Sequence, residues 1–227
     1  VMALTVAPAE VRALAALTEG WPAGLQLAAL TLQGRPDVAG LVAAFTGSHR
    51  YILDYLTEEV FSRQPAEVRA FLQRTCIADR LCAPLCQALW PAEAAPSLAD
   101  CQARLEGLER ANLFLIPLDD ERCWYRYHHL FADLLRQRLK QRWPGQVGSL
   151  HSRASLWYEN AGRLAKAARH ALAAGDVQRV ARLAERDALA MFDRGELAGL
   201  AGWLTAIPSE IIHARPWLCV AQAWTLA

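Results

Sequence analysis

One stretch of the sequence decides the fold: Cys123-Trp124-Tyr125-Arg126-Tyr127-His128-His129-Leu130-Phe131-Ala132-Asp133-Leu134-Leu135-Arg136. An aromatic, strand-like run turns without a loop into an amphipathic helix, and two histidines stand at the joint. The N-terminus of a helix attracts anions, because its first amides lack partners and its dipole end is positive. His128 is therefore placed to meet a phosphate or a carboxylate, or else both histidines only cap the helix.

The residues just before the joint have the pattern of a β-hairpin. Leu113–Leu118 is a compact apolar run, Asp119-Asp120-Glu121 is a polar tip, and Cys123–Tyr127 is aromatic. The change from helical to strand-like periodicity predicts two short antiparallel strands. The aromatic stripe through the joint is expected in the core; it comprises Trp124, Tyr125, Tyr127 and Phe131.

Three helices are predicted upstream of the hairpin. Pro65 suits the first position of a helix that ends near Thr75. A short helix is expected over Ala83–Leu89, and Ser97 is a good N-cap for a third helix. Three helices followed by a two-stranded hairpin is the order of elements in a winged helix.

Past Gly145 the composition becomes rich in Ala, Leu and Arg, with helices separated at Gly162, Gly175-Asp176, Gly195 and Pro208. Helices of this length and spacing predict antiparallel pairs stacked as a solenoid, with a loose tetratricopeptide-like pattern. The expected fold is mainly α. Helices are predicted over 1–48, a winged helix over 49–144, and the start of a helical superhelix over 145–227.

Composition excludes several classes of protein. The net charge is +1, which argues against a dedicated nucleic-acid surface. The six cysteines contain no CxxC pair, so free thiols in a cytoplasmic protein are expected rather than disulfides or zinc. There is no signal peptide and no apolar run of membrane-spanning length. Residue 1 is Val and the sequence ends in an apolar helical run, so an internal piece of a longer polypeptide is expected.

Four motifs in order resemble one family. They are Thr18-Glu19-Gly20-Trp21-Pro22-Ala23-Gly24-Leu25-Gln26-Leu27, Leu108-Glu109-Arg110-Ala111-Asn112-Leu113-Phe114, Tyr127-His128-His129-Leu130-Phe131 and His170-Ala171-Leu172-Ala173-Ala174-Gly175-Asp176. Together they look like the large LuxR-type transcriptional activators of the maltose-regulator class, which belong to the signal transduction ATPases with numerous domains.

The resemblance implies a position within a longer regulator. Members of the family carry a P-loop nucleotide domain, a winged helix, a superhelix that senses an inducer, and a C-terminal helix-turn-helix that binds DNA. This sequence has no GxxxxGK[ST] phosphate loop, so the chain itself is not expected to be an enzyme or to bind ATP or ADP tightly. The resemblance also implies that residues 1–48 are the C-terminal helical part of the ATPase module, and that the full-length protein is a slow ATPase switch. The implied partners are the P-loop domain and superhelix of the same chain, an inducer, and further copies of the activated protein.

The resemblance also implies nucleotide contacts in the full-length protein. Gly20, Trp21 and Pro22 match an element whose proline lies against the adenine base, although a proline that starts a helix is the simpler structural explanation. His128 aligns with a winged-helix histidine that contacts the β-phosphate of ADP and holds the resting state. His129 replaces an acidic residue found in some branches of the superfamily, and helix capping is its default role.

Other functions remain as alternatives. A helical-repeat scaffold for protein partners would make both histidines structural. An autonomous DNA-binding winged helix is disfavoured by the acidic hairpin tip and by the mixed charges of Ser97–Ala111. A metal enzyme based on His128 and His129 is poorly supported, because neighbouring helical residues point in different directions. The basic run Arg136, Arg138, Lys140 and Arg142 is assigned to the helix dipole and to solubility.

Overall fold

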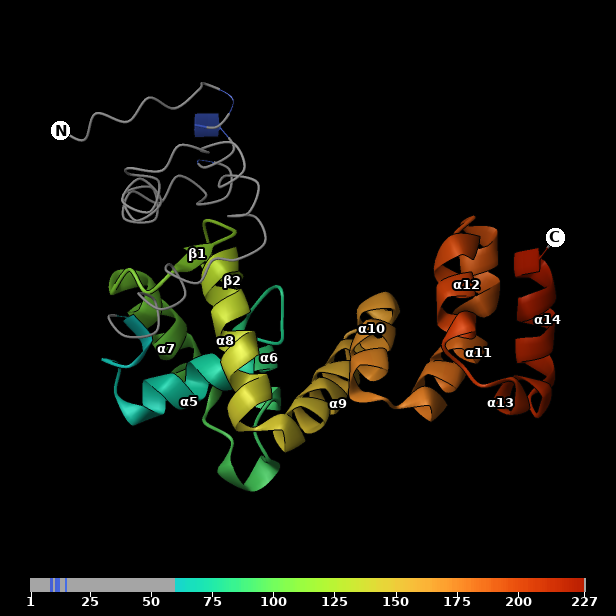
Figure 1. Cartoon of the computed structure of the whole chain (residues 1–227), viewed down its shortest axis with the longest axis horizontal. Coiled ribbons are helices and arrows are strands. Elements are labelled where there is room, and N and C mark those ends of the chain that lie inside the picture. The colour runs from blue at the N-terminus through green and yellow to red at the C-terminus, as the bar shows by residue number, and fades with distance from the viewer. Residues whose placement is uncertain (1–8, 10, 13–14, 16–59, 227) are drawn as a thin grey trace, which may run out of the picture. The chain divides into compact units, whose positions relative to one another are not determined.

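The computed structural model describes residues 9, 11, 12, 15 and 60–226, and it is mostly helical with one small antiparallel sheet (Figure 1). The predicted fold class is therefore confirmed. The helical part predicted over 1–48, with the Gly20-Trp21-Pro22 element, lies outside the described residues apart from residues 9, 11, 12 and 15. The predicted domain boundaries stay predictions.

The described elements follow in order along the chain. They are α5 (Ala66–Thr75), α6 (Ala83–Ala88), the 3-10 helix η2 (Ala92–Ala94), α7 (Leu98–Arg110), β1 (Leu115–Pro117), β2 (Tyr125–Tyr127), α8 (His129–Arg142), α9 (Pro144–Asn160), α10 (Leu164–Ala174), α11 (Val177–Asp193), α12 (Leu197–Thr205), α13 (Ser209–His213) and α14 (Pro216–Leu226). The chain forms two compact units. One contains Ala103–Arg138 and the described residues up to Arg80, and the other contains Leu81–Gln102 and the described residues from 139 onward.

The starts of α5 and α7 follow from their first residues. Pro65 is the N-cap of α5 and not its first helical residue, so that prediction was wrong by one position. Ser97 caps α7 as predicted: its hydroxyl oxygen accepts a bond from the Asp100 amide at 3.0 Å. The Asp100 carboxylate in turn accepts one from the Ser97 amide at 3.2 Å. This reciprocal pair satisfies two amides that the helix leaves without partners.

The predicted hairpin is confirmed, with shorter strands than expected. β1 pairs with β2 in antiparallel register, so that Leu115 lies opposite Tyr127 and Pro117 lies opposite Tyr125. Tyr125, Tyr127 and Phe131 are buried, as predicted for the aromatic stripe, while Trp124 is partly exposed.

Helices α9 and α10 in the second unit form a helical hairpin, joined by three residues. Gly162 at φ +69° ends α9, and the turn is closed by bonds from the Gly162 amide to Glu159 O and from the Arg163 amide to Tyr158 O. The same pattern recurs at Gly175 and Gly195, both also at positive φ. Glycine meets no steric penalty in this conformation. These three predicted breaks are therefore real helix ends, and the fourth, Pro208, lies between α12 and α13. The likeness to tetratricopeptide repeats stays a prediction.

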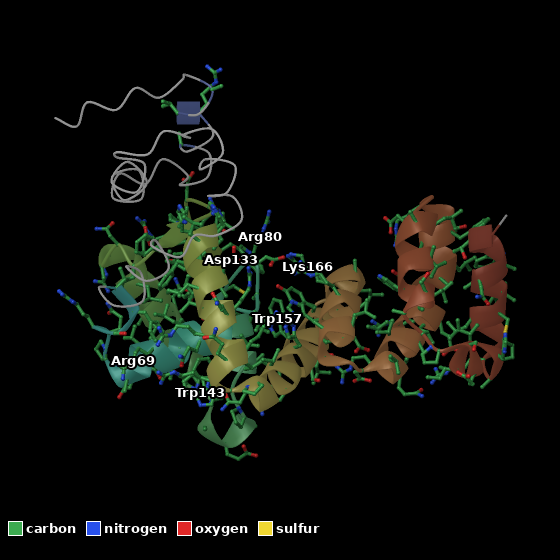
Figure 2. The ribbon with its side chains drawn as sticks, viewed as in Figure 1. Arg69, Arg80, Asp133, Trp143, Trp157 and Lys166 are labelled. Carbon is green, nitrogen blue, oxygen red and sulfur yellow. The ribbon has the colours of Figure 1, made fainter. Side chains whose placement is uncertain are left out.

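Aromatic and histidine rings fill the space between α9 and α10. His170 stacks on Tyr158 with the centroids 5.3 Å apart, and its Nδ1 lies 2.8 Å from Nδ1 of His151. One of these two nitrogens must donate and the other accept, so the two rings differ in the protonation of Nδ1. Lys166 Nζ lies 5.5 Å from the centroid of the Tyr158 ring, and Figure 2 shows Lys166 on α10 and Trp157 on α9.

Glu159 ties α9 to α11 through arginines. Its side chain is almost fully buried, and its carboxylate accepts bonds from Arg182 at 2.6 and 3.2 Å and from Arg186 at 3.3 Å. The hydrogen bond from Arg182 lowers the pKa of Glu159 below its ordinary value, and this outweighs the opposite effect of burial. The carboxylate is therefore ionised when the protein is folded.

Within residues 60–226 and the few described positions before them, no helix is both long and apolar enough to cross a membrane.

Glu159→Gln is expected to destabilise the second unit by about 2 kcal/mol, because it removes the charge that the arginines surround. The lowered pKa means that Glu159 stabilises the fold above pH 4.5, its ordinary pKa, and that this contribution is lost as the pH falls through the lower folded value. Urea unfolding at several pH values measures both effects, and the wild-type and variant curves should converge in acid.

Glu196→Gln is the matched control, since Glu196 is paired with Arg194 in an exposed position. Exposed ion pairs contribute little, so this variant should unfold like the wild type. Equal losses in the two variants would contradict the special role of Glu159.

Candidate functional site

The candidate site is the joint between the hairpin and α8. The His128 amide donates to Phe114 O at 2.8 Å, which extends the hairpin ladder by one bond beyond β1 and β2. The His128 carbonyl accepts from the Ala132 amide at 2.9 Å, which is the first bond of α8. His128 therefore ends the strand and caps the helix through its backbone.

The imidazole of His128 is held between two other rings. It is 5% exposed, meets the Phe114 ring edge-on with centroids 6.1 Å apart, and stacks on His129 at 4.8 Å. The two histidine rings thus lie face to face, so the expectation that they point in different directions was wrong. Because so little of this ring is exposed, it contacts a phosphate only when the joint opens or when the ligand itself packs against the ring.

The turn that leads from α7 into β1 uses two left-handed residues. Asn112 at φ +50° ends α7, with its amide bonded to Glu109 O and the Leu113 amide bonded to Leu108 O. Asparagine tolerates this conformation better than most residues. Phe114 at φ +55° does not, and such a bulky residue is held there at a cost of about 1–2 kcal/mol.

Packing and hydrogen bonding hold Phe114 in this strained conformation. Its ring packs on Phe131 of α8 with centroids 5.2 Å apart, and its carbonyl accepts the His128 amide. Strain of this kind is kept where the surroundings over-determine the backbone, and switch regions are a common place for it. The joint is therefore a position at which a small movement of the hairpin changes several contacts together.

A buried hydroxyl pair links the hairpin to α5. Thr75 Oγ1 and Tyr127 Oη lie 2.7 Å apart, and Thr75 Oγ1 also donates to Phe71 O at 2.7 Å. Because Thr75 already donates to Phe71, the Tyr127 hydroxyl is the donor in the pair. This bond joins the last residue of α5 to the residue next to His128.

Arg136 of α8 binds the chain just after α5. Its Nε donates to Cys76 O at 2.9 Å, and its guanidinium pairs with Asp79 at 3.4 Å and Asp133 at 3.2 Å. Arg136 therefore has a structural role beyond the predicted helix dipole and solubility, because its guanidinium satisfies a backbone carbonyl far away in the sequence.

The acidic tip of the hairpin has a structural use. The Asp119 carboxylate accepts from the Cys123 amide at 2.7 Å and from the Trp124 amide at 3.1 Å, so it closes the tip. Arg122, at φ +54°, pairs with Glu109 of α7 at 3.1 Å. The charged side chains of Asp119 and Arg122 thus bind partners within the winged helix.

The buried thiols of Cys76 and Cys86 are not reactive thiolates. All six are free, and Cys76, Cys82, Cys86 and Cys101 are buried. Burial raises the pKa of Cys76 to about 12, against the lowering effect of the Arg136 guanidinium. Burial, with the neighbouring Cys101 and Cys82, also raises the pKa of Cys86 well above its ordinary value. Thiols of this kind are inert near neutral pH. In the described part of the chain no three His, Cys, Asp or Glu side chains are grouped to hold a metal ion.

Of the four predicted nucleotide residues, the structure describes His128 alone. Gly20, Trp21 and Pro22 lie outside the described residues, so their nearness to His128 stays a prediction. Sequence reasoning missed Phe114, Thr75 and Arg136 as supports of the joint. The one available signal for Phe114 was its place two residues after Asn112 in the motif Leu108–Phe114. Thr75 and Arg136 bond to residues 52 and 60 positions away, and no local sequence pattern reveals such pairs.

Comparison with known proteins places this joint in a recognised domain. A family model described as the MalT winged helix domain matches residues 57–147. These residues include the whole hairpin, the joint and α8.

The chain as a whole is also similar to longer proteins. It is 35% identical over 216 residues to the serine/threonine-protein kinase PknK of Mycobacterium tuberculosis, covering 95% of this chain and 19% of the kinase. It is 33% identical over 208 residues to the HTH-type transcriptional regulator MalT of Vibrio cholerae, and 35% identical over 210 residues to that of Serratia proteamaculans. Each match covers 91% of this chain and 22% of the regulator. The chain thus spans about a fifth of the length of these relatives.

Thr75→Val should destabilise the first unit by about 1–2 kcal/mol, since it removes a buried hydrogen bond to Tyr127. Tyr127→Phe should do the same, and the double variant should lose less than the sum of the two. Urea unfolding of the four proteins gives the coupling. Thr205→Val is the control, because the exposed Thr205 hydroxyl bonds within its own helix to Ala201 O. Strict additivity of the two substitutions would contradict the hydroxyl pair.

Proposed function

The chain carries a winged helix domain of the MalT family, and on this basis we propose that it is the regulatory part of an ATP-dependent LuxR-type transcriptional activator. The similarity to MalT regulators extends over nine-tenths of the chain and supports a regulatory role. The observation that carries the proposal is the match over residues 57–147, with His128 at its hairpin–helix joint.

In this proposal the nucleotide state is read at the joint. ADP holds the winged helix against the nucleotide domain through His128, while Gly20, Trp21 and Pro22 contact the base. The packing of the His128 ring between Phe114 and His129 supports this, because release of the histidine changes the contacts of the hairpin and of α8 at once. ATP and inducer together release the clamp and permit self-association.

The winged helix acts in this scheme as an interdomain element and not as a DNA reader. Arg104 of α7 pairs with Glu67 at 3.4 Å, and Arg122 pairs with Glu109 at 3.1 Å. A surface that binds DNA uses its arginines to neutralise phosphates. Pairing with carboxylates of the same domain supports a structural role, and DNA binding falls to a C-terminal domain of the full-length protein.

The remaining parts of the proposal concern the whole protein. Its partners are a P-loop domain, a helical superhelix with tetratricopeptide-like repeats, a small-molecule or protein inducer, and further copies of itself. It works in the cytoplasm as a slow ATPase switch, and this chain contributes no catalytic residue.

One observation favours a second candidate function. The similarity to PknK covers 95% of this chain, and that relative is named as a protein kinase and not as a DNA-binding regulator. A helical-repeat scaffold that holds a protein partner would suit both kinds of relative. Isothermal titration of the full-length protein with ATP and ADP separates the two functions, because a scaffold produces no heat of binding.

His128→Ala in the full-length protein is expected to weaken ADP binding about tenfold and to raise transcription in the absence of inducer, since one hydrogen bond to a charged group is lost. The backbone bonds of residue 128 are kept, so the joint should still form. Equilibrium binding of ADP and a promoter–reporter assay measure the two effects.

His128→Gln and His213→Ala are the controls for this experiment. The glutamine amide still donates a hydrogen bond and should restore part of the ADP affinity, whereas loss of the exposed ring at 213 in α13 should change it little. Unchanged ADP affinity and unchanged basal transcription in His128→Ala would overturn the proposal.

A further inference from the structure

Two histidines in the second unit form a titratable contact that the nucleotide switch does not use. His151 of α9 and His170 of α10 place their Nδ1 atoms 2.8 Å apart, and their ring centroids are separated by 5.0 Å. His170 is only 2% exposed, whereas His151 is partly exposed. Nearer the turn of the hairpin, Ser155 Oγ donates to Ala167 O at 2.8 Å. The histidine pair therefore lies within the surface that α9 and α10 bury against each other.

The number of protons on the pair decides whether the bond between the rings exists. A neutral imidazole carries one hydrogen and one lone pair on its nitrogens, so the neutral pair makes one Nδ1–H···Nδ1 bond. One added proton turns the donor ring into an imidazolium, which strengthens the bond to the neutral acceptor ring. A second added proton can enter only at the acceptor Nδ1, because the other three nitrogens already carry hydrogens. Both Nδ1 atoms are then donors, and the bond is lost.

The surroundings of His170 oppose a positive charge on its ring. Burial in a protein interior disfavours the charged form of an imidazole. The ring stacks on the buried Tyr158 with the centroids 5.3 Å apart, and Lys166 Nζ lies 5.5 Å from the centroid of the same tyrosine ring. A charge on His170 would place a second cation at the Tyr158 ring. The first added proton is therefore better placed on the more exposed His151.

Helix α6 packs on α9 and brings no charge to the pair. The six residues of α6 contain no acidic or basic side chain. Its one titratable group is the thiol of Cys86, which stays neutral because burial and neighbouring cysteines raise its pKa well above the ordinary value. On α9 itself, Arg153 donates to Leu89 O at 3.3 Å, and Glu159 accepts bonds from arginines of α11. These two charges of α9 are thus paired with other groups.

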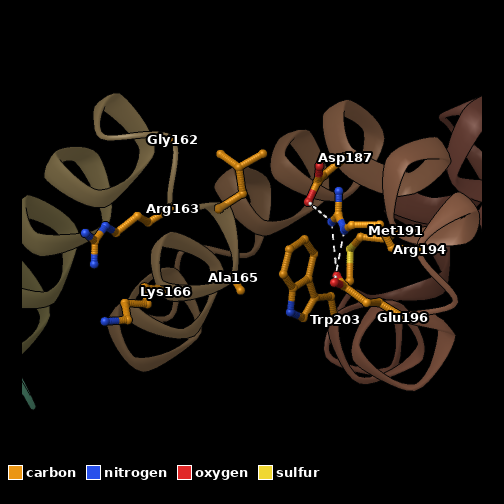
Figure 3. Close-up of a pocket in the computed structure, with 10 residues that line it drawn as sticks. Gly162, Arg163, Ala165, Lys166, Asp187, Met191, Arg194, Glu196 and Trp203 are labelled. Atoms are coloured by element: carbon orange, nitrogen blue, oxygen red, sulfur yellow. Dashed lines mark hydrogen bonds and ion pairs between the residues drawn. The ribbon is translucent and has the colours of Figure 1, made fainter.

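The remaining charges around the pair belong to α10 and α11, which pack on each other. Those of α10 and its N-cap are basic: Arg163 and Lys166 lie at the start of the helix, as Figure 3 shows, and Arg169 is exposed. The arginines of α11 surround Glu159, so that carboxylate is already neutralised. The other carboxylates of α11 are paired with arginines or lie exposed at its end; they are Glu185 with Arg215, Asp187 with Arg194, and Asp193.

We propose that His151 and His170 form a proton-sensitive latch, which holds α9 and α10 together through one shared hydrogen and opens when both rings are protonated. In the unfolded chain each ring binds a proton near the ordinary pKa of histidine, about 6.5, whereas the closed latch accepts one proton in all. Because the unfolded state then binds more protons, the stability of the hairpin falls as the pH drops below this value. The latch lies on different elements from the joint at His128 and does not depend on its nucleotide role.

Long-range ¹H–¹⁵N NMR of the histidine rings in the 227-residue chain tests the latch, because it reports which ring nitrogens carry hydrogens. At about pH 8, one Nδ1 of the pair should carry a hydrogen and the other should not. As the pH is lowered to about 4.5, the pair should take up its two protons in steps at least about one pH unit apart, a tenfold difference in proton affinity. The second step should shift the amides of Ser155 and Ala167, since α9 and α10 then separate. The exposed His213 of α13 is the internal control and should titrate in a single step.

Two variants separate the shared bond from simple burial. His151→Phe keeps an aromatic ring beside His170 but removes the shared bond, so His170 should take up its proton about tenfold more readily than in the second step of the wild type. His213→Phe changes an exposed ring outside the hairpin and should leave both steps unchanged. An unchanged titration of His170 in His151→Phe would mean that burial alone controls this ring, and it would overturn the latch. The measurement on the unchanged protein does not depend on how the variants fold: uptake of both protons in one step, two Nδ1 atoms in the same protonation state above neutral pH, or unmoved Ser155 and Ala167 amides would each overturn the latch as well.

Discussion

The left-handed backbone of Phe114 is the constraint on which the winged helix depends. Because φ is positive there, the chain leaves α7 and enters β1 with the Phe114 carbonyl directed at the His128 amide. That single bond sets the end of β2 and the start of α8 together. The ring of Phe114, packed on Phe131 and His128, maintains the strained conformation. A movement of β2, of the turn at Phe114 or of α8 therefore changes the contacts of the other two.

In each unit a few buried or partly buried polar contacts hold neighbouring elements together. In the first unit the Thr75–Tyr127 hydroxyl pair and the Arg136–Cys76 bond fix the end of α5. In the second unit Glu159 joins α9 to α11 by accepting bonds from arginines of α11. Pairing a buried polar group gives little net gain in folding free energy, whereas leaving it unpaired costs much more. Such contacts therefore favour one arrangement of the helices over others more than they add to stability.

Local chemistry made much of the fold predictable. Ser97 with Asp100 marks a helix start, Gly162 marks a helix end, and the run from Cys123 to Tyr127 marks a strand, because each signal acts within a few residues. Pro65 was placed one residue too far into its helix, since a proline fits both the N-cap and the first helical position. The left-handed Phe114 and the partners of Glu159 were not predictable, because packing from distant parts of the chain decides them. In the candidate site the position of His128 before a helix was foreseen, whereas its burial between two rings was not.

The central claim is that nucleotide state is read at the joint between the hairpin and α8. Hydrogen–deuterium exchange of the full-length protein tests it most directly, at the amides of His128 and Ala132. On the proposed mechanism ADP holds the joint, so both amides should exchange slowly when ADP is bound. ATP and inducer should release it, so that exchange becomes faster at these two positions than in α10. Equal exchange in the two nucleotide states would contradict the account.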